Sequence, residues 1–165
     1  MVWQDNSLCE TGFKIWRKVG SGTYTQVAAV AANSATWTDA TVVAGYRYCY
    51  VVRAYNALGN SLQSNEACGC TGTPSPPSGL DAWNVWNLRI RMEWQDNSLC
   101  ETGFKIWRKV GYGGTYALVK TLGANVTTWT DTVGVEGYTY CYVVAAYNAL
   151  STSAYSNQDC AQAYD

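Results

Sequence analysis

The 165-residue sequence has no histidine, and it contains only two phenylalanines, two methionines and three prolines. Without histidine there is no Ser-His or Cys-His pair for nucleophilic catalysis, no histidine-ligated zinc or iron site, and no ordinary general base with a pKa near neutrality. We therefore expect a protein that is not an enzyme, with no catalytic residues, no cofactor and no metal site.

Charge and long apolar runs are also scarce. Charged residues make up 14% of the chain, and 11 basic against 12 acidic residues give a net charge of −1. The absence of basic runs argues against nucleic acid as a partner. No stretch approaches eighteen apolar residues, so no membrane span is expected, and residues 1–6 lack the features of a signal peptide.

Seven cysteines are the first positive signal. The chain has no Cys-x-x-Cys pair and no histidine to complete a zinc site, so the cysteines are interpreted as disulfide partners. This indicates an extracellular or cell-surface location. We interpret the sequence as a mature segment or a piece of a longer exported polypeptide.

An internal repeat organises the chain. Residues 3–20 recur without change at residues 94–111, and one extra residue in 112–114 changes the offset from 91 to 92. All three prolines lie in residues 69–79, which has the composition of a linker. We predict one domain over 1–68, a linker over 69–79 and a second domain over 80–165.

The two copies begin at different points of the repeat. Residues 77–93 precede Trp94 in the second copy, whereas two residues precede Trp3 in the first. The first copy is therefore expected to lack its first strand and part of its second. Two explanations stay open: the sequence begins inside a module, or a strand from a neighbouring chain completes that module.

Apolar and polar residues alternate over short runs in both copies, as in residues 88–94 and 104–109, and residues 138–147 are rich in tyrosine and valine. Gly, Asn, Asp and Ser separate these runs, and no helical stripe is present. The pattern predicts an all-β sandwich with about seven strands in a complete module. Asp5 and Glu10, repeated as Asp96 and Glu101, are interpreted as turn and surface residues because they offer too few oxygens for calcium.

Several motifs in order resemble the fibronectin type III domains of bacterial-type extracellular proteins. They are Trp94 with the turn at 96–98, the segment 101–106, the Trp-Thr-Asp strand at 129–131, and residues 137–140 leading into 146–149. The resemblance implies two tandem immunoglobulin-like sandwiches. It also implies that Trp3 and Trp94 are core residues and that Tyr48 and Tyr140 occupy the tyrosine-corner position. It does not imply an activity.

The cysteine spacing predicts specific pairs. Cys49 and Cys68 are equidistant from the turn at 58–59, and Cys141 and Cys160 from the turn at 150–151, so each pair falls on opposite positions of antiparallel strands. In the topology that the resemblance implies, Cys70 faces Cys100 and would join the two domains. Cys9 is then either bonded to a preceding module or neighbouring chain, or a free thiol.

Aromatic side chains are the candidates for surface binding. Trp16 and Trp107 alternate with core residues and should point outward, where they share a sheet with Tyr55 and Tyr147. These four residues could stack on a sugar or contact another protein, or they could form a ladder that only stiffens the sheet.

The expected function is a non-enzymatic extracellular structural or adhesive repeat module: a spacer, a stalk, or a surface-filament subunit completed by a strand from a neighbouring chain. Its partners would be other protein modules or copies of itself. The alternative is a carbohydrate-binding accessory module of a secreted polysaccharide-degrading enzyme, with polysaccharide as its ligand.

Overall fold

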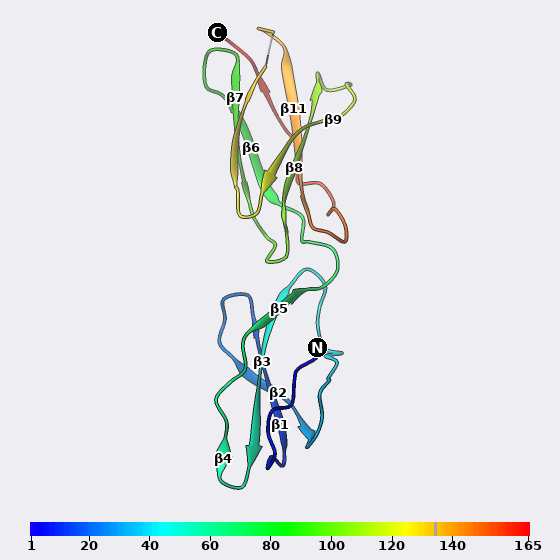
Figure 1. Ribbon diagram of the computed structural model, residues 1–165. Helices are drawn as coiled ribbons and strands as arrows, with labels where there is room; N and C mark the ends of the chain where they lie inside the picture. The colour runs from blue at the N-terminus through cyan, green and yellow to red at the C-terminus, as the bar shows by residue number, and fades with distance from the viewer. Residues whose placement is uncertain (134) are drawn as a thin grey trace. The chain divides into compact units, whose positions relative to one another are not determined.

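The computed structural model describes residues 1–133 and 135–165 and divides the chain into two compact units, Met1–Thr71 (unit 1) and Gly72–Asp165 (unit 2) (Figure 1). Its regular structure is all β, as predicted, and no described helix is long and apolar enough to cross a membrane. The strands of unit 1 are β1 (Gly12–Val19), β2 (Thr25–Ala31), β3 (Arg47–Asn56), β4 (Gly59–Asn60) and β5 (Ala67–Cys70). The strands of unit 2 are β6 (Ser78–Asn84), β7 (Arg89–Gln95), β8 (Gly103–Val110), β9 (Ala117–Gly123), β10 (Thr128–Thr132), β11 (Thr139–Tyr147) and β12 (Asp159–Gln162).

Unit 2 is a sandwich of two antiparallel sheets, visible as two layers in Figure 1. One sheet has the order β10-β7-β6 and the other β12-β11-β8-β9. Alternation in β7 explains how the layers meet, since Ile90, Met92 and Trp94 are buried while the residues between them are exposed. They pack with Leu80 and Ala82 of β6 against the buried face of β8 and β11.

Unit 1 keeps only one of these sheets in full. Its main sheet has the order β2-β1-β3-β4, with β5 also paired to β3. In place of the second sheet, a single bridge joins Val2 to Thr36, supported by backbone hydrogen bonds from Trp3 N to Ala35 O and from Trp37 N to Met1 O. Unit 1 thus has no described counterpart of β6, and only Met1 onward corresponds to β7.

The missing layer changes the core. The buried cluster of unit 1 contains only Phe13, Ile15 and Val52, whereas the cluster of unit 2 includes residues from both sheets. Trp94 is 5% exposed, but its counterpart Trp3 is only partly buried and meets Phe13 with ring centroids 5.7 Å apart. Trp3 therefore belongs to the core, as expected, but with one side uncovered.

Fewer residues lie between the strands of the two units than the predicted linker, residues 69–79, contains. Strand β5 continues to Cys70 and strand β6 begins at Ser78, so only residues 71–77 lie between the strands of the two units.

Candidate functional site

Disulfide bonds close the last hairpin of both units. One joins Cys49 to Cys68 and the other joins Cys141 to Cys160. Each pair lies directly opposite in register, on β3 and β5 and on β11 and β12. In each unit the bridge fastens a four-residue strand, β5 or β12, to its neighbour. Glu66 lies beside the first bridge, but disulfide sulfurs offer no thiolate, so this group is not a metal site.

The three remaining cysteines are Cys9, Cys70 and Cys100. Cys9 is exposed and free within the described residues, which leaves both of its expected states open. The predicted pair of Cys70 with Cys100 would join the two units and stays a prediction.

The four aromatic residues predicted to point outward do not form one surface. Trp16 lies opposite Val51 and Tyr55 lies opposite Gly12, so within unit 1 the two rings are four strand positions apart. Lys14 lies 4.8 Å from the Tyr55 ring centroid and Arg53 lies 5.9 Å from that of Trp16. Each ring is therefore partly covered by a cation of its own unit.

Unit 2 places a different group around its outward tryptophan. The Trp107 ring meets Tyr155 edge-on with centroids 4.9 Å apart, and Tyr155 is 6.3 Å from Tyr116. Lys105 covers Tyr147 at 5.0 Å, separately from this cluster. The sequence prediction missed Tyr155 and Tyr116. A comparison of the two copies could have singled out Tyr155, because Gln63 occupies the equivalent position in the first copy.

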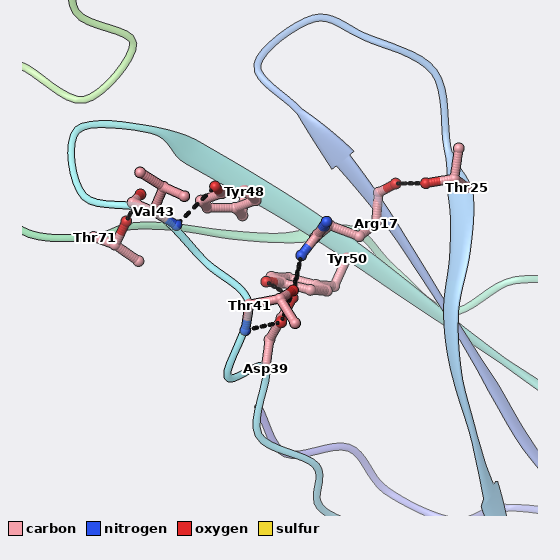
Figure 2. A network of polar contacts seen from close by, with 8 residues as sticks. All are labelled: Arg17, Thr25, Asp39, Thr41, Val43, Tyr48, Tyr50 and Thr71. Atoms are coloured by element: carbon pink, nitrogen blue, oxygen red, sulfur yellow. Dashed lines mark hydrogen bonds and ion pairs between the residues drawn. The ribbon is translucent and has the colours of Figure 1, made fainter.

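A polar network surrounds a carboxylate in each unit, and Figure 2 shows the network of unit 1. In unit 1 the Arg17 guanidinium donates to the Asp39 carboxylate at 2.7 Å, and the hydroxyls of Thr41 and Tyr50 donate to the same carboxylate at 2.7 and 2.9 Å. In unit 2 Arg108 and Tyr142 contact Asp131 in the same way, at 2.7 and 3.1 Å. Sequence reasoning missed this network, although the arginine, aspartate and tyrosine all repeat at the copy offset.

The network holds Asp39 ionised. Burial acts to raise the pKa of Asp39, but hydrogen bonds from Thr41, Arg17 and Tyr50 outweigh it and lower the pKa to about 2. Burial and the hydrogen bond to Asp39 raise the pKa of Tyr50 to about 12. A carboxylate with these partners is a poor base at neutral pH, so the network is structural.

The tyrosine-corner residues occupy their expected place. The Tyr48 hydroxyl accepts from Val43 N at 3.0 Å, as Figure 2 shows, and the Tyr140 hydroxyl donates to Val135 O at 3.4 Å. Both contacts reach back five residues, which fixes the loop before the central strand. Asp5 and Asp96 each accept from a backbone N–H two residues on, at 2.9 Å, as expected of turn residues.

Unit 1 also carries an open groove. Two hollows of about 390 and 380 Å³ share the lining residues Trp3, Gln4, Asn6, Val52 and Ser64, so they form one continuous feature. The groove runs between the first residues of the chain and the segment 61–67. We call it the open groove.

These features define a class of fold: two tandem antiparallel sandwiches of the fibronectin type III kind. Among solved structures, the chain is similar to a two fibronectin type-III domain segment from chicken tenascin. Identity is 15%, the match covers 98% of this chain and 89% of that one, and the TM-score is 0.51. No protein-family model and no curated protein matches the chain.

A second similar structure is that of the FN1-FN3 domains of chicken CNTN1. Identity is 14%, the match covers 96% of this chain but 58% of that one, and the TM-score is 0.54. At such identities the likeness establishes the fold, and the role must come from the residues of this chain.

Proposed function

We propose that the chain is a non-enzymatic structural and adhesive module of a bacterial-type exported protein, serving as a spacer, a stalk or a subunit of a surface filament. The observation that carries this proposal is the disulfide that closes the last hairpin of each unit. Such bonds persist outside the cytoplasm and hold a strand in place when the chain ends are pulled. The fibronectin type III fold, common to many structural modules, supports the same role. Its partners would be other protein modules or further copies of the chain.

Pulling a single molecule by its two ends tests the load-bearing role. A Cys9→Ser background prevents dimers through the free thiol. We expect two discrete unfolding events, each shortened by its closed disulfide loop. Variants that lose one bridge, Cys49→Ser with Cys68→Ser or Cys141→Ser with Cys160→Ser, should each lengthen one event by roughly 65 Å, the reach of 19 residue steps.

The absence of discrete events at measurable force would contradict a load-bearing role. A pair of variants that lengthens neither event would contradict the assignment of the loops. Both results would be independent of whether the chain binds any ligand.

The second candidate is binding of a polysaccharide, and the cluster of Trp107, Tyr116 and Tyr155 favours it. Tyr155 is 50% exposed and its ring adjoins Trp107, so one apolar surface is open to solvent. Affinity electrophoresis in gels that contain soluble glycans tests this candidate. Retardation should disappear in Trp107→Ala and persist in the matched control Trp16→Ala, because Trp16 has no neighbouring tyrosine equivalent to Tyr155. Equal mobility with and without glycan would reject it.

A further inference from the structure

We propose that the cluster of Trp107, Tyr116 and Tyr155 in unit 2 binds a polysaccharide whose sugars carry carboxylates, and that Lys109 binds the carboxylate. This deepens the second candidate under the proposed function and rests on it, because it names the class of glycan. The argument compares unit 2 with unit 1, which has the same strand in different surroundings.

Strands β1 and β8 have the identical sequence GFKIWRKV. Phe104 and Ile106 of β8 are buried in the core. The alternate residues Lys105, Trp107 and Lys109 therefore lie on the opposite face of the sheet. Because the two strands are identical, the outer faces of the units differ only through the segments that surround them, and unit 1 serves as an internal reference.

In unit 1 a carboxylate occupies this face. Glu66 forms an ion pair with Lys18 at 2.6 Å, and it also accepts a hydrogen bond from the Tyr24 hydroxyl. The Lys18 ammonium lies 5.0 Å from the centroid of the Tyr24 ring. A carboxylate therefore fits where this ammonium and this hydroxyl meet, and the chain itself supplies it in unit 1.

Unit 2 keeps the lysine and the tyrosine but lacks that carboxylate. Lys109 lies 5.0 Å from the centroid of the Tyr116 ring, as its counterpart does in unit 1. Gln158 replaces Glu66, and its amide oxygen accepts from the Tyr116 hydroxyl at 2.7 Å. Lys109 donates to the Tyr112 carbonyl at 2.8 Å, and within residues 1–133 and 135–165 it forms no ion pair. Two of its three ammonium hydrogens are therefore free to bind an anion.

The aromatic part of the surface also differs between the units. In unit 1 the Arg53 guanidinium lies over the Trp16 ring and donates to Gln63 at 3.3 Å. In unit 2 an alanine replaces that arginine and Tyr155 replaces the glutamine, so Trp107 meets a tyrosine ring instead of a cation. The exchange puts an exposed apolar surface where unit 1 has a charged cover.

A sugar with a carboxylate carries both groups that this surface recognises. One face of its ring presents C–H groups that pack on aromatic rings, and the carboxylate is attached to the same ring. In unit 2 the rings of Tyr155 and Tyr116 are 6.3 Å apart, and Lys109 is 5.0 Å from the second ring. An acidic peptide matches this arrangement less well, because its carboxylates lie on flexible side chains without an adjoining apolar ring.

Gln158 adds a donor that the glutamate of unit 1 does not have. Its amide nitrogen makes one contact, with the Cys160 sulfur at 3.5 Å, and sulfur is a weak acceptor. The amide N–H can therefore turn to a ligand carboxylate. We expect that carboxylate to take the position that Glu66 holds in unit 1, between the Lys109 ammonium and the Gln158 amide.

A second ammonium lies on the other side of Trp107. Lys105 lies 5.0 Å from the centroid of the Tyr147 ring and makes a long contact of 3.4 Å to the Thr152 hydroxyl. It too forms no ion pair in the part of the chain that the structure describes. Two cations on one face, with an aromatic residue between them, suit successive acidic sugars of a polymer rather than a single anion.

The experiment measures binding of the full chain to polygalacturonate and to its methyl ester by titration calorimetry at physiological salt. The two polymers share a backbone, and only the first carries free carboxylates. We expect polygalacturonate to bind more tightly by about fivefold or more. Gln158→Glu should remove this preference, because it restores the internal partner of the ammonium. Gln158 is exposed and unit 1 carries glutamate at the equivalent position, so the fold should not change.

Lys109→Ala should weaken binding to polygalacturonate by about fivefold or more and leave binding to the methyl ester unchanged. Lys18→Ala is the matched control and should leave both affinities unchanged, because Glu66 already neutralises Lys18. An unchanged affinity in Lys109→Ala, or an equal loss in Lys18→Ala, would overturn the proposal.

Two other polyanions test what the surface recognises. Polyglutamate and dextran sulfate should bind more weakly than polygalacturonate, and Trp107→Ala should not alter that weak binding. Polyglutamate that binds as tightly and depends on Trp107 would assign the surface to an acidic peptide. Dextran sulfate that does so would assign it to sulfated sugars. Either result would overturn the proposal.

The proposal and the second candidate fail separately. If both galacturonate polymers bind equally and Trp107→Ala abolishes both, the cluster binds polysaccharide without regard to charge, and only this proposal fails. If neither binds but a neutral glycan is retarded in a Trp107-dependent manner, again only this proposal fails. If no glycan is bound at all, both fail. None of these results depends on the force measurements.

Discussion

Arg17 of strand β1 and Asp39 of a loop form an ion pair at 2.7 Å, and Arg108 and Asp131 repeat it at the same distance in unit 2. Both carboxylates are largely buried, with side-chain exposures of 7% and 8%. The Asp39 carboxylate must stay ionised to keep its contacts, so the pair in unit 1 couples stability to pH.

Acidification should destabilise unit 1 through Asp39. Its pKa is lowered from 3.8 to about 2 in the folded state, so its contribution is present above pH 4 and is lost as the pH falls toward 2. We expect a loss on the order of 1–2 kcal/mol in the free energy of unfolding. Urea unfolding between pH 7 and pH 2 measures it. Asp39→Asn should be less stable at pH 7 and should lose this part of the pH dependence; an unchanged slope in the variant would show that other groups cause it.

Gly103 permits a close approach of β8 and β9 that a side chain would prevent. A Cβ atom at this position would lie 1.9 Å from the Leu122 carbonyl oxygen and 3.0 Å from the Tyr147 ring. Gly103→Ala should therefore destabilise unit 2 by about 1–3 kcal/mol. Its register partner Gly123 is the control, because a Cβ atom there meets nothing within 4 Å. Thermal melts of the two variants compare them, and equal losses would refute the steric explanation.

The sequence predicted the sandwich because strand alternation and the exact repeat are local signals. It also placed Cys49 opposite Cys68, because distance from a turn sets register in a hairpin. The network around Asp39 was not predicted, since it joins residues from β1, β3 and a loop that come together only when the sheets pack. The open groove needed the structure as well, because its lining comes from the first residues of the chain and from the segment 61–67, which are far apart in the sequence.

Loss of a hairpin disulfide should affect the two units unequally. Opening a loop of 19 residue separations costs about 3 kcal/mol by the loop-entropy account. Unit 1 has three residues in its buried cluster, so Cys49→Ser with Cys68→Ser should lower the melting temperature of unit 1 by more than the equivalent change lowers that of unit 2. Cys141→Ser with Cys160→Ser should leave unit 2 folded with a lower melting temperature. Calorimetry that finds equal shifts of the melting temperature in the two units would show that the size of the core does not determine how strongly a unit depends on its disulfide.

The pairing of Cys70 with Cys100 can be tested by peptide mapping without reduction. Trypsin leaves Cys68 and Cys70 on one peptide, residues 54–89, because no lysine or arginine separates them. The Cys49→Ser, Cys68→Ser variant removes this ambiguity and leaves Cys70 as the only cysteine of that peptide. We expect the peptide to be linked to residues 92–105, which contain Cys100, and the peptide with Cys9 to be alkylated before reduction. A Cys70 peptide linked to Cys9, or released with a free thiol, would overturn the predicted disulfide between Cys70 and Cys100.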